Sequence, residues 1–191
     1  ITALAVGKNR TMAHSLAGDG FLIGDEASAY WIGRMALNSA LRARDRRGGD
    51  NELLAVACKH FGAEPYQLAH VVHQLNRSVN AIANFAKLVN ELAVAGNEAA
   101  YEILDAAASE IVLIATTAKR ECEGGSGFQV ALIGGVLAPE NLVTKLVGQK
   151  LAECGLSIHI SGKSSLDGAG ILANLPEPGV FKDLIRIFTK P

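Results

Sequence analysis

The sequence predicts an α/β protein in which a long block of helices interrupts a pattern of strands and helices. Two observations lead to this fold class. Residues 2–6, 128–133 and 156–160 are short apolar runs with the length and composition of strands, and residues 46–122 consist almost entirely of segments with helical periodicity. Strand and helix alternate after this block, as is typical of parallel strands joined by helices. We therefore expect one α/β lobe, residues 1–191, with a helical subdomain inserted at about 46–122.

The first half of the chain begins with a predicted β-hairpin. Residues 2–6 and 11–16 are apolar runs, and Gly7-Lys-Asn9 between them suits a turn. A glycine-rich stretch, residues 18–26, precedes a helix expected at about 27–45, where apolar residues recur at helical spacing. Four more helices are expected at residues 52–61, 65–75, 79–95 and 98–120, with Pro65 in the first turn of the second and Asn97 as the N-cap of the last.

The second half of the chain is predicted to alternate strand and helix. The apolar run at 128–133 fits a buried parallel strand that ends at Gly134-Gly135. A helix at 141–153 is followed by Gly155, which suits a helix C-terminus. The remaining elements are expected as a strand at 156–160, a polar loop at 162–167, the tightly packed start of a helix at 168–173 and a terminal helix at 180–188.

The composition is that of an ordinary globular protein. Hydrophobic residues make up 49% of the 191 residues, charged residues make up 19%, and the formal net charge is −1. This balance does not suggest binding to nucleic acid or to an anionic membrane. No stretch reaches the roughly 18 apolar residues of a membrane helix, and no signal peptide is evident, so we expect a cytoplasmic protein. Because the chain opens with Ile1 rather than Met, we expect it to begin inside a longer polypeptide.

The cysteines and histidines predict no metal site. An odd number of widely spaced cysteines gives neither a disulfide framework nor metal-ligand spacing. His70 and His73 lie three residues apart, whereas a zinc-binding helix places two histidines four apart with a glutamate between them. The cysteines are Cys58, Cys122 and Cys154. We therefore expect no metal ligand set in this chain.

The glycine-rich stretch Gly18-Asp-Gly-Phe-Leu-Ile-Gly-Asp-Glu26 is the first candidate site. Its glycines would let the backbone come close to a ligand. The carboxylate of Asp25 would accept hydrogen bonds from sugar hydroxyls, and charge-assisted hydrogen bonds are among the stronger ones. The simpler alternative is that Asp25 and Glu26 cap the helix that follows and favour its dipole.

Two further glycine-containing segments are candidate sites. Gly134-Gly135 follows an apolar strand, and ligands of α/β sheets bind at the carboxyl ends of strands, but a plain tight turn is an equal alternative. Ser164-Ser-Leu-Asp-Gly-Ala-Gly170 places small residues at a predicted helix start, which suits either an anion or close helix packing. This segment lacks the spacing of a Walker A phosphate loop.

Three motifs together resemble one known family. Gly24-Asp-Glu-Ala-Ser-Ala-Tyr-Trp-Ile-Gly-Arg34 resembles the Gly-Asp-Glu-Gly-Ser-Gly/Ala-Tyr-Trp-Ile-Gly signature of N-acetylglucosamine kinases and of the wider BadF/BadG/BcrA/BcrD-type ATPase family. Val130-Ala-Leu-Ile-Gly-Gly-Val136 resembles the adenosine motif of that family, and Ser165–Ala173 resembles its closing small-residue helix. Gly96-Asn97 falls where these proteins often have Gly-Asp between two long helices. The likeness extends from about Ile1 to Ala173.

The resemblance implies the C-terminal lobe of a ribonuclease H-like (actin-like ATPase) fold with a large helical insert. It also implies ATP-dependent phosphorylation of an amino sugar, N-acetylglucosamine or glucosamine, with ATP and Mg²⁺ as cofactors. We further expect a homodimer. The residues that the resemblance places at the sugar are Gly18, Gly20, Asp25 and Ala29, and those that it places at the nucleotide are Gly134, Gly135, Val136, Gly168 and Ala169.

The sequence departs from the family pattern in two ways. Asp19 stands where relatives carry an aromatic residue and Ala27 where they carry glycine, and both positions flank the expected sugar. Relatives also begin with an N-terminal kinase lobe that holds the first phosphate loop, the catalytic Asp and the second phosphate loop, and this lobe is missing here. We therefore expect no catalytic residue in this chain, no activity of the chain alone, and an unpaired edge on the strand at 2–6.

Two alternatives from other classes are open. The first is an ATPase subunit of the dehydratase-activator type, which belongs to the same family and holds an iron–sulfur cluster through cysteines at a subunit interface. The second is a nucleotide-binding module without catalytic activity, which the missing N-terminal lobe favours for this chain taken alone.

Overall fold

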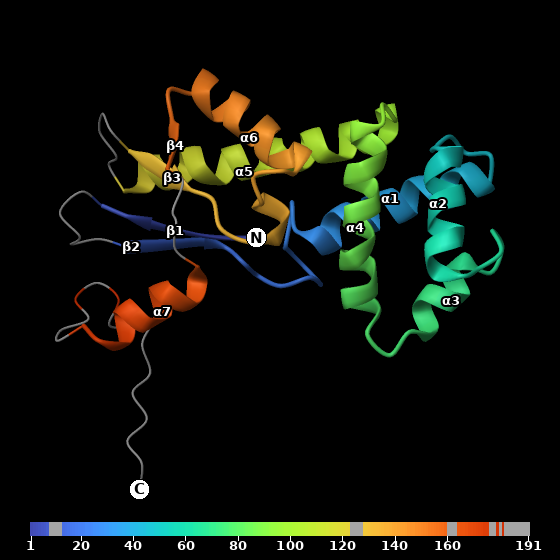
Figure 1. Ribbon diagram of the computed structural model, residues 1–191, viewed down its shortest axis with the longest axis horizontal. Coiled ribbons are helices and arrows are strands. Elements are labelled where there is room, and N and C mark those ends of the chain that lie inside the picture. The colour runs from blue at the N-terminus through green and yellow to red at the C-terminus, as the bar shows by residue number, and fades with distance from the viewer. Residues whose placement is uncertain (8–12, 123–127, 160–163, 176–178, 180, 182–191) are drawn as a thin grey trace, which may run out of the picture.

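The computed structural model describes residues 1–7, 13–122, 128–159, 164–175, 179 and 181. These residues form a mixed α/β fold that is mostly helical. Figure 1 shows helices α1 to α4 toward one end of the molecule and the strands toward the other, with the long helix α5 reaching both. The turn of the predicted hairpin lies outside the described residues, as does all of the predicted helix at 180–188 except Phe181.

Five helices precede the second group of strands, and side-chain caps set the start of three of them. Ser28, Asp50 and Asn97 each accept the backbone N–H of the residue three positions later, so the predicted cap at Asn97 is confirmed. Gly62, with φ of 62°, ends its helix in the left-handed conformation. The five helices are α1 (Ala29–Arg44), α2 (Asn51–Phe61), α3 (Leu68–Gln74), α4 (Ser78–Val94) and α5 (Glu98–Glu121).

The expected helix start at Pro65 is wrong. The Gln67 N–H donates to the Glu64 carbonyl at 2.8 Å, so Pro65 lies in a separate turn, and α3 begins only at Leu68. Gln67, the residue before α3, makes no side-chain cap. Proline suits a first helical turn and a β-turn equally well, which is why the residue type did not distinguish them.

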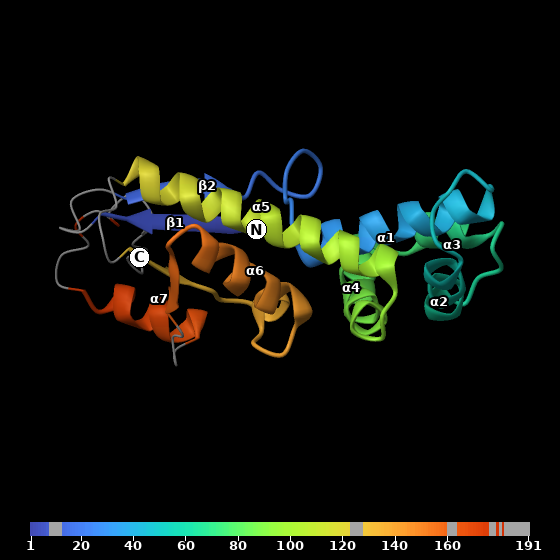
Figure 2. The ribbon, with the colours of Figure 1, turned by 90° about the horizontal axis from the view of Figure 1, so that it is seen from above.

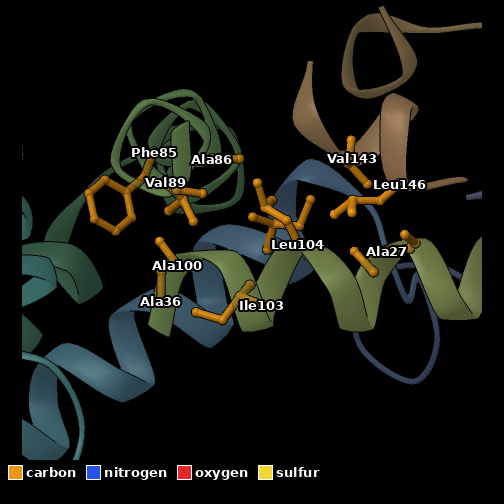
Figure 3. Packing of buried hydrophobic residues seen from close by; sticks show 14 of the residues in the cluster. Ala27, Ala36, Phe85, Ala86, Val89, Ala100, Ile103, Leu104, Val143 and Leu146 are labelled. Carbon is orange, nitrogen blue, oxygen red and sulfur yellow. The ribbon is translucent and has the colours of Figure 1, made fainter. Parts of the chain in front are cut away.

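One apolar core follows α5 and joins the helices to the C-terminal part of the fold. Phe85 and Val89 of α4 and Leu104 of α5 are at most 1% exposed. Figure 3 shows these side chains over α5, with Val143 and Leu146 of α6 (Leu142–Glu153) further along the same helix. All of them belong to one cluster of buried residues, so the helical part shares its core with the α/β part.

Gly33 lets α1 pack directly against the backbone of α4. A Cβ atom at this position would lie 2.0 Å from the carbonyl oxygen of Ile82 and 2.9 Å from its carbonyl carbon. Gly33 is itself buried, as are Ile32 and Ala36 on the same helix. The glycine that closes the Tyr-Trp-Ile-Gly motif therefore has a packing role, because a side chain would push the two helices apart.

The predicted N-terminal hairpin is confirmed. Strands β1 (Thr2–Val6) and β2 (Ala13–Ala17) pair antiparallel, with Thr2 opposite Ala17 and Val6 opposite Ala13. The hairpin packs on the C-terminal end of α5, where Ala5 forms a small second core with Ala118 and Cys122. Within the described residues β1 pairs only with β2.

The second sheet is smaller than the sequence predicts. Strand β3 covers only Gln129–Ala131, and it pairs in parallel with β4 (Ser157–His159), with α6 between them in sequence. The prediction of a buried strand over 128–133 is wrong: Gln129 and Ala131 are exposed and Val130 is half-buried. The physical reason is that β3 has one partner strand among the described residues, so its other edge and part of its faces remain open.

The C-terminal elements are also placed differently from the prediction. Gly155, with φ of 65°, follows α6 as expected. The next helix, α7, covers Ser165–Ala173, so it begins inside the segment predicted as a polar loop at 162–167. Figures 1 and 2 both show α7 apart from helices α1 to α4.

Candidate functional site

The turn after β3 has an open backbone surface. Gly134 adopts φ 118° and ψ 163°, which is favourable only for glycine. It opens a short 3₁₀ turn, η1 (Gly135–Leu137), closed by the Leu137 N–H, which donates to the Gly134 carbonyl at 3.0 Å. A Cβ atom at Gly134 or at Gly135 would meet no atom within 4 Å. The two glycines therefore expose a strip of backbone at the carboxyl end of a parallel strand, which a flat ligand could approach closely.

The glycine-rich stretch forms a compact loop against β1. The Gly24 N–H donates to the Gly20 carbonyl at 2.9 Å. Gly18, with φ of 89°, lies so close to β1 that a Cβ atom would come within 2.3 Å of the Thr2 hydroxyl oxygen. Gly20, with φ of 87°, has open space instead. Gly18 thus serves the packing of the loop, while Gly20 leaves backbone accessible to a ligand.

Asp25 is not the cap of the following helix. It has φ of 71°, in the left-handed region that is uncommon for residues other than glycine, and Ser28 caps α1 by accepting the Trp31 N–H at 3.0 Å. The Asp25 carboxylate accepts a hydrogen bond of 2.7 Å from the terminal ammonium group of Ile1. The prediction that Asp25 and Glu26 cap the helix is therefore wrong, and the unusual conformation directs the Asp25 carboxylate toward the start of β1.

Two other positions of this loop have structural explanations. Ala27 has φ of 60° and is completely buried, so the residue that replaces the usual glycine keeps a glycine-like conformation while its methyl group joins the core. Ala29 is half-buried and packs against the main core. Ala29 can therefore contribute to a ligand site mainly through its backbone.

The loop also carries apolar side chains that the sequence reasoning passed over. Leu22 and Ile23 are 82% and 85% exposed, and Phe21 makes an edge-to-face contact with Tyr30 at 5.5 Å between ring centroids. The sequence did contain a sign of this surface, because three adjacent apolar residues, 21–23, stand between two glycines. Exposed apolar groups at the edge of a candidate site are typical of surfaces that another molecule or domain covers.

Gly168 and Ala169 lie in the first turns of α7. A Cβ atom at Gly168 would meet nothing within 4 Å, so the predicted close packing of this helix start is wrong within the described residues. Ser164 and Asp167 form a reciprocal capping box, in which Asp167 accepts the Ser164 N–H at 2.7 Å and donates its own N–H to the Ser164 hydroxyl at 3.2 Å. Because the Asp167 carboxylate already occupies this N-terminus, an added anion is disfavoured there.

We expect the capping box to show a distinct pH response. The hydrogen bonds from the Ser164 hydroxyl and from its backbone N–H hold the pKa of Asp167 below its ordinary value. A carboxyl with a lowered pKa stabilises the fold above about pH 4, and this contribution is lost as the pH falls through the lowered pKa. An NMR titration should give a low Asp167 pKa in the native chain and a higher one in Ser164→Ala, which loses the hydroxyl donor and keeps the backbone N–H donor. Equal pKa values in the two proteins would contradict the capping box.

A groove of about 690 Å³ separates the two sheets. The whole of β1 lines one side, β3 and the residues up to Ile133 line the other, and α5 forms the floor through Ile111, Ala115 and Ala118. Ile1 and Leu137 also line this groove, so it runs from the Asp25 contact toward the turn after β3. The groove thus lies beside the two candidate ligand regions, the Gly18–Ala29 loop and the Gly134–Val136 turn, but no residue of either region lines it.

Among the described residues, helix α7 contributes nothing to the main apolar core or to the lining of this groove. No group of three or more His, Cys, Asp or Glu side chains that could hold a metal ion occurs among the described residues. No helix in the described part of the chain is long and apolar enough to cross a membrane.

The family of the chain follows from comparison with known proteins. Residues 3–169 match the BadF/BadG/BcrA/BcrD ATPase family, and the chain belongs to this family. The matched segment includes the glycine-rich loop, the turn after β3 and the first part of α7. The search of curated proteins gives no match.

A solved structure shares the fold. The chain is similar to a provisionally named N-acetylglucosamine kinase from Chromobacterium violaceum, with 20% sequence identity, a TM-score of 0.69 and 90% of this chain covered. At this identity the likeness shows the fold alone. The chain spans 58% of the length of that solved structure.

Proposed function

We propose that this chain is the C-terminal lobe of a sugar kinase that transfers a phosphoryl group from ATP to an amino sugar, N-acetylglucosamine or glucosamine. The observation that carries the proposal is the open backbone strip at Gly134-Gly135, which follows the parallel strand β3. Membership of an ATPase family supports a nucleotide at such a strip.

The two regions have different chemistry, which suits two different ligands. Gly134, Gly135 and Val136 present backbone without side-chain obstruction, which fits the flat adenosine part of ATP. Asp25 presents a half-buried carboxylate, which fits a sugar hydroxyl because the charged acceptor strengthens the hydrogen bond. Backbone of the surrounding loop at Gly18, Gly20 and Ala29 would complete the sugar contact, and Gly168 and Ala169 of α7 would close the nucleotide side.

ATP would supply the phosphoryl group when bound, and phosphoryl transfer depends mainly on positioning and on neutralising charge. The described residues contain no group of three or more side chains that could hold a metal ion by themselves, and Mg²⁺ in phosphoryl transfer is usually held by one or two carboxylates together with the substrate phosphates. In the proposed kinase the phosphate loops and the catalytic base belong to an N-terminal lobe, as the family resemblance implies. This chain would orient the sugar and the nucleotide.

The groove between the sheets supports the proposed N-terminal lobe. The edges of β1 and β3 that face the groove lack a partner strand among the described residues, and unpaired edges accept a further strand readily. We propose that an extended segment upstream of β1 fills the groove and pairs with both strands. Its apolar side chains would cover Leu4 and Ile133, which are 49% and 51% exposed.

Hydrogen exchange tests this strand. In a polypeptide that carries the upstream segment, backbone amides of β1 and β3 should exchange at least tenfold more slowly than in the 191-residue chain, because new inter-strand hydrogen bonds protect them. Amides near Phe85 in the buried part of α4 serve as the control and should change little. Equal exchange of β1 in the two proteins would rule out a strand in the groove.

Sugar-dependent release of ADP tests the kinase itself. The chain alone and the longer polypeptide would be assayed with N-acetylglucosamine and with glucosamine. Turnover by the longer polypeptide only is the expected result. Turnover by the chain alone would contradict the assignment of the catalytic machinery to another lobe, and no turnover by either would contradict the kinase.

The structure gives no specific support to the iron–sulfur alternative. Cys58 lies in α2, Cys122 follows α5 and Cys154 follows α6, and no cluster of three metal ligands forms within the described residues. Burial raises the pKa of the Cys58 thiol, which makes that thiol less reactive as a thiolate. The homodimer and the module without catalytic activity remain predictions that sedimentation and the ADP assay can address.

A further inference from the structure

The turn proposed to bind the nucleotide is held by a side chain from α6. The side-chain N–H groups of Asn141 donate to the carbonyls of Gly135 at 2.8 Å and of Val136 at 3.0 Å. The Thr144 hydroxyl donates to the Ala138 carbonyl at 2.8 Å. Val136 and Leu137 of the turn pack against the main core, whereas Gly134 and Gly135 make no such contact, so these bonds help to fix where the open backbone strip lies.

Asn141 occupies the N-cap position of α6 but does not cap that helix. An asparagine at this position ordinarily accepts a backbone N–H of the first turn through its side-chain oxygen. Here a residue of another helix takes that role: the side-chain oxygen of Asn90, on α4, accepts the Leu142 N–H at 2.9 Å. The cap supplied by α4 leaves Asn141 available to hold the turn.

We infer that Asn141 is a positioning residue for the nucleotide and that Asn90 links the helical part of the fold to the nucleotide turn. This inference rests on the proposed function, because it treats the Gly134–Val136 turn as the nucleotide site. The link consists of three steps: Asn90 fixes the start of α6, α6 carries Asn141, and Asn141 fixes the turn.

Each asparagine acts through a different atom of its own side-chain amide, Asn90 through the oxygen and Asn141 through the nitrogen. Substitution by aspartate therefore affects the two residues differently and tests the inference. Asn90 acts through its oxygen, which an aspartate retains. Asn141 acts through its nitrogen, which an aspartate lacks, and a carboxylate would face two carbonyl oxygens. At the same time aspartate is as good an N-cap as asparagine and suits a helix N-terminus electrostatically. Asn141→Asp should therefore release the turn without destabilising α6.

The experiment compares Asn90→Asp, Asn141→Asp and Asn90→Ala in two assays. Amide exchange of Leu137 and Ala138 is measured by NMR in the 191-residue chain, and ATP and sugar kinetics are measured in the longer polypeptide. For Asn141→Asp we expect faster exchange of both amides and a KM for ATP raised roughly tenfold, as two hydrogen bonds are lost. The Tm, the kcat and the sugar KM should stay close to those of the native protein.

The other variants separate positioning from simple stability. Asn90→Asp should match the native protein in every measurement, whereas Asn90→Ala should lower the Tm and raise the KM for ATP. If Asn141→Asp leaves the exchange of Leu137 unchanged, or lowers the Tm as much as Asn90→Ala does, the positioning role is wrong. If exchange accelerates while the KM for ATP stays the same in an active kinase, the link to the nucleotide is wrong. An unmodified longer polypeptide that turns over no ATP would instead mark a failure of the proposed function.

Discussion

Gly33→Ala is expected to destabilise the fold by about 2–3 kcal/mol, although it adds only one methyl group. The added Cβ would lie 2.0 Å from the Ile82 carbonyl oxygen, and backbone cannot move aside as the end of a flexible side chain can. Separating α1 from α4 would open the core around Phe85 and Ile32. The gain in helix propensity from glycine to alanine, about 1 kcal/mol, offsets only part of this cost.

Gly148→Ala is the matched control, because it is the same change inside another helix. The nearest atom to a Cβ at Gly148 is the Cδ1 of Ile158 at 3.4 Å, an ordinary contact with a side chain that can adjust. Chemical denaturation should therefore find Gly148→Ala as stable as the native chain or slightly more stable. Equal loss in the two variants would show that the close approach of α1 and α4 is not what Gly33 provides.

Asp25→Ala should reduce kcat/KM for the sugar about tenfold to a hundredfold in the longer polypeptide, while the KM for ATP stays nearly the same. A hydrogen bond to a charged group contributes roughly 1.5–3 kcal/mol, which corresponds to this range. The separation is expected because Asp25 lies in the loop before α1, whereas the open backbone strip lies after β3. Steady-state kinetics with each substrate varied in turn measures both effects.

Asp105→Ala controls for the loss of a carboxylate elsewhere. Asp105 makes an ion pair with Lys150 at 2.9 Å on the surface between α5 and α6, and such pairs contribute little to stability. This variant should keep the native kinetics. Equal losses of sugar and ATP use in Asp25→Ala would reject the sugar role of Asp25 and would suggest that its unusual conformation supports the fold instead.

The helices could be predicted because their signals are local. Asn97 and Gly62 stand where a helix starts and ends, and the apolar spacing between such residues gives the bounds of α1, α2, α4 and α5 within two residues. The prediction of a buried strand at 128–133 was wrong because burial of a strand is not a local property. Whether an apolar run forms a buried strand depends on the strands beside it, and β3 has one neighbour among the described residues.

The sequence predicted where the glycine-containing turns of the candidate site lie. It did not predict which side chains form hydrogen bonds there. Gly134 has a conformation that the residue type itself suggests, so a turn after an apolar strand could be expected. Asp25 could not be separated from a helix cap, because carboxylates are common at both kinds of site. The bond between Asn90 and Leu142 joins residues 52 positions apart, and only the packing of α4 against α6 brings them together.

Helix α5 is one unbroken helix of 24 residues, which corresponds to a length of about 36 Å. Its first half packs among α1 and α4, and its second half carries the hairpin and the floor of the groove. The helical part and the sheets therefore pack against one continuous helix. If the proposed lobes close on their substrates, the nucleotide turn and the helical part should move together as one rigid body. The hinge of that closure would then lie outside residues 98–121.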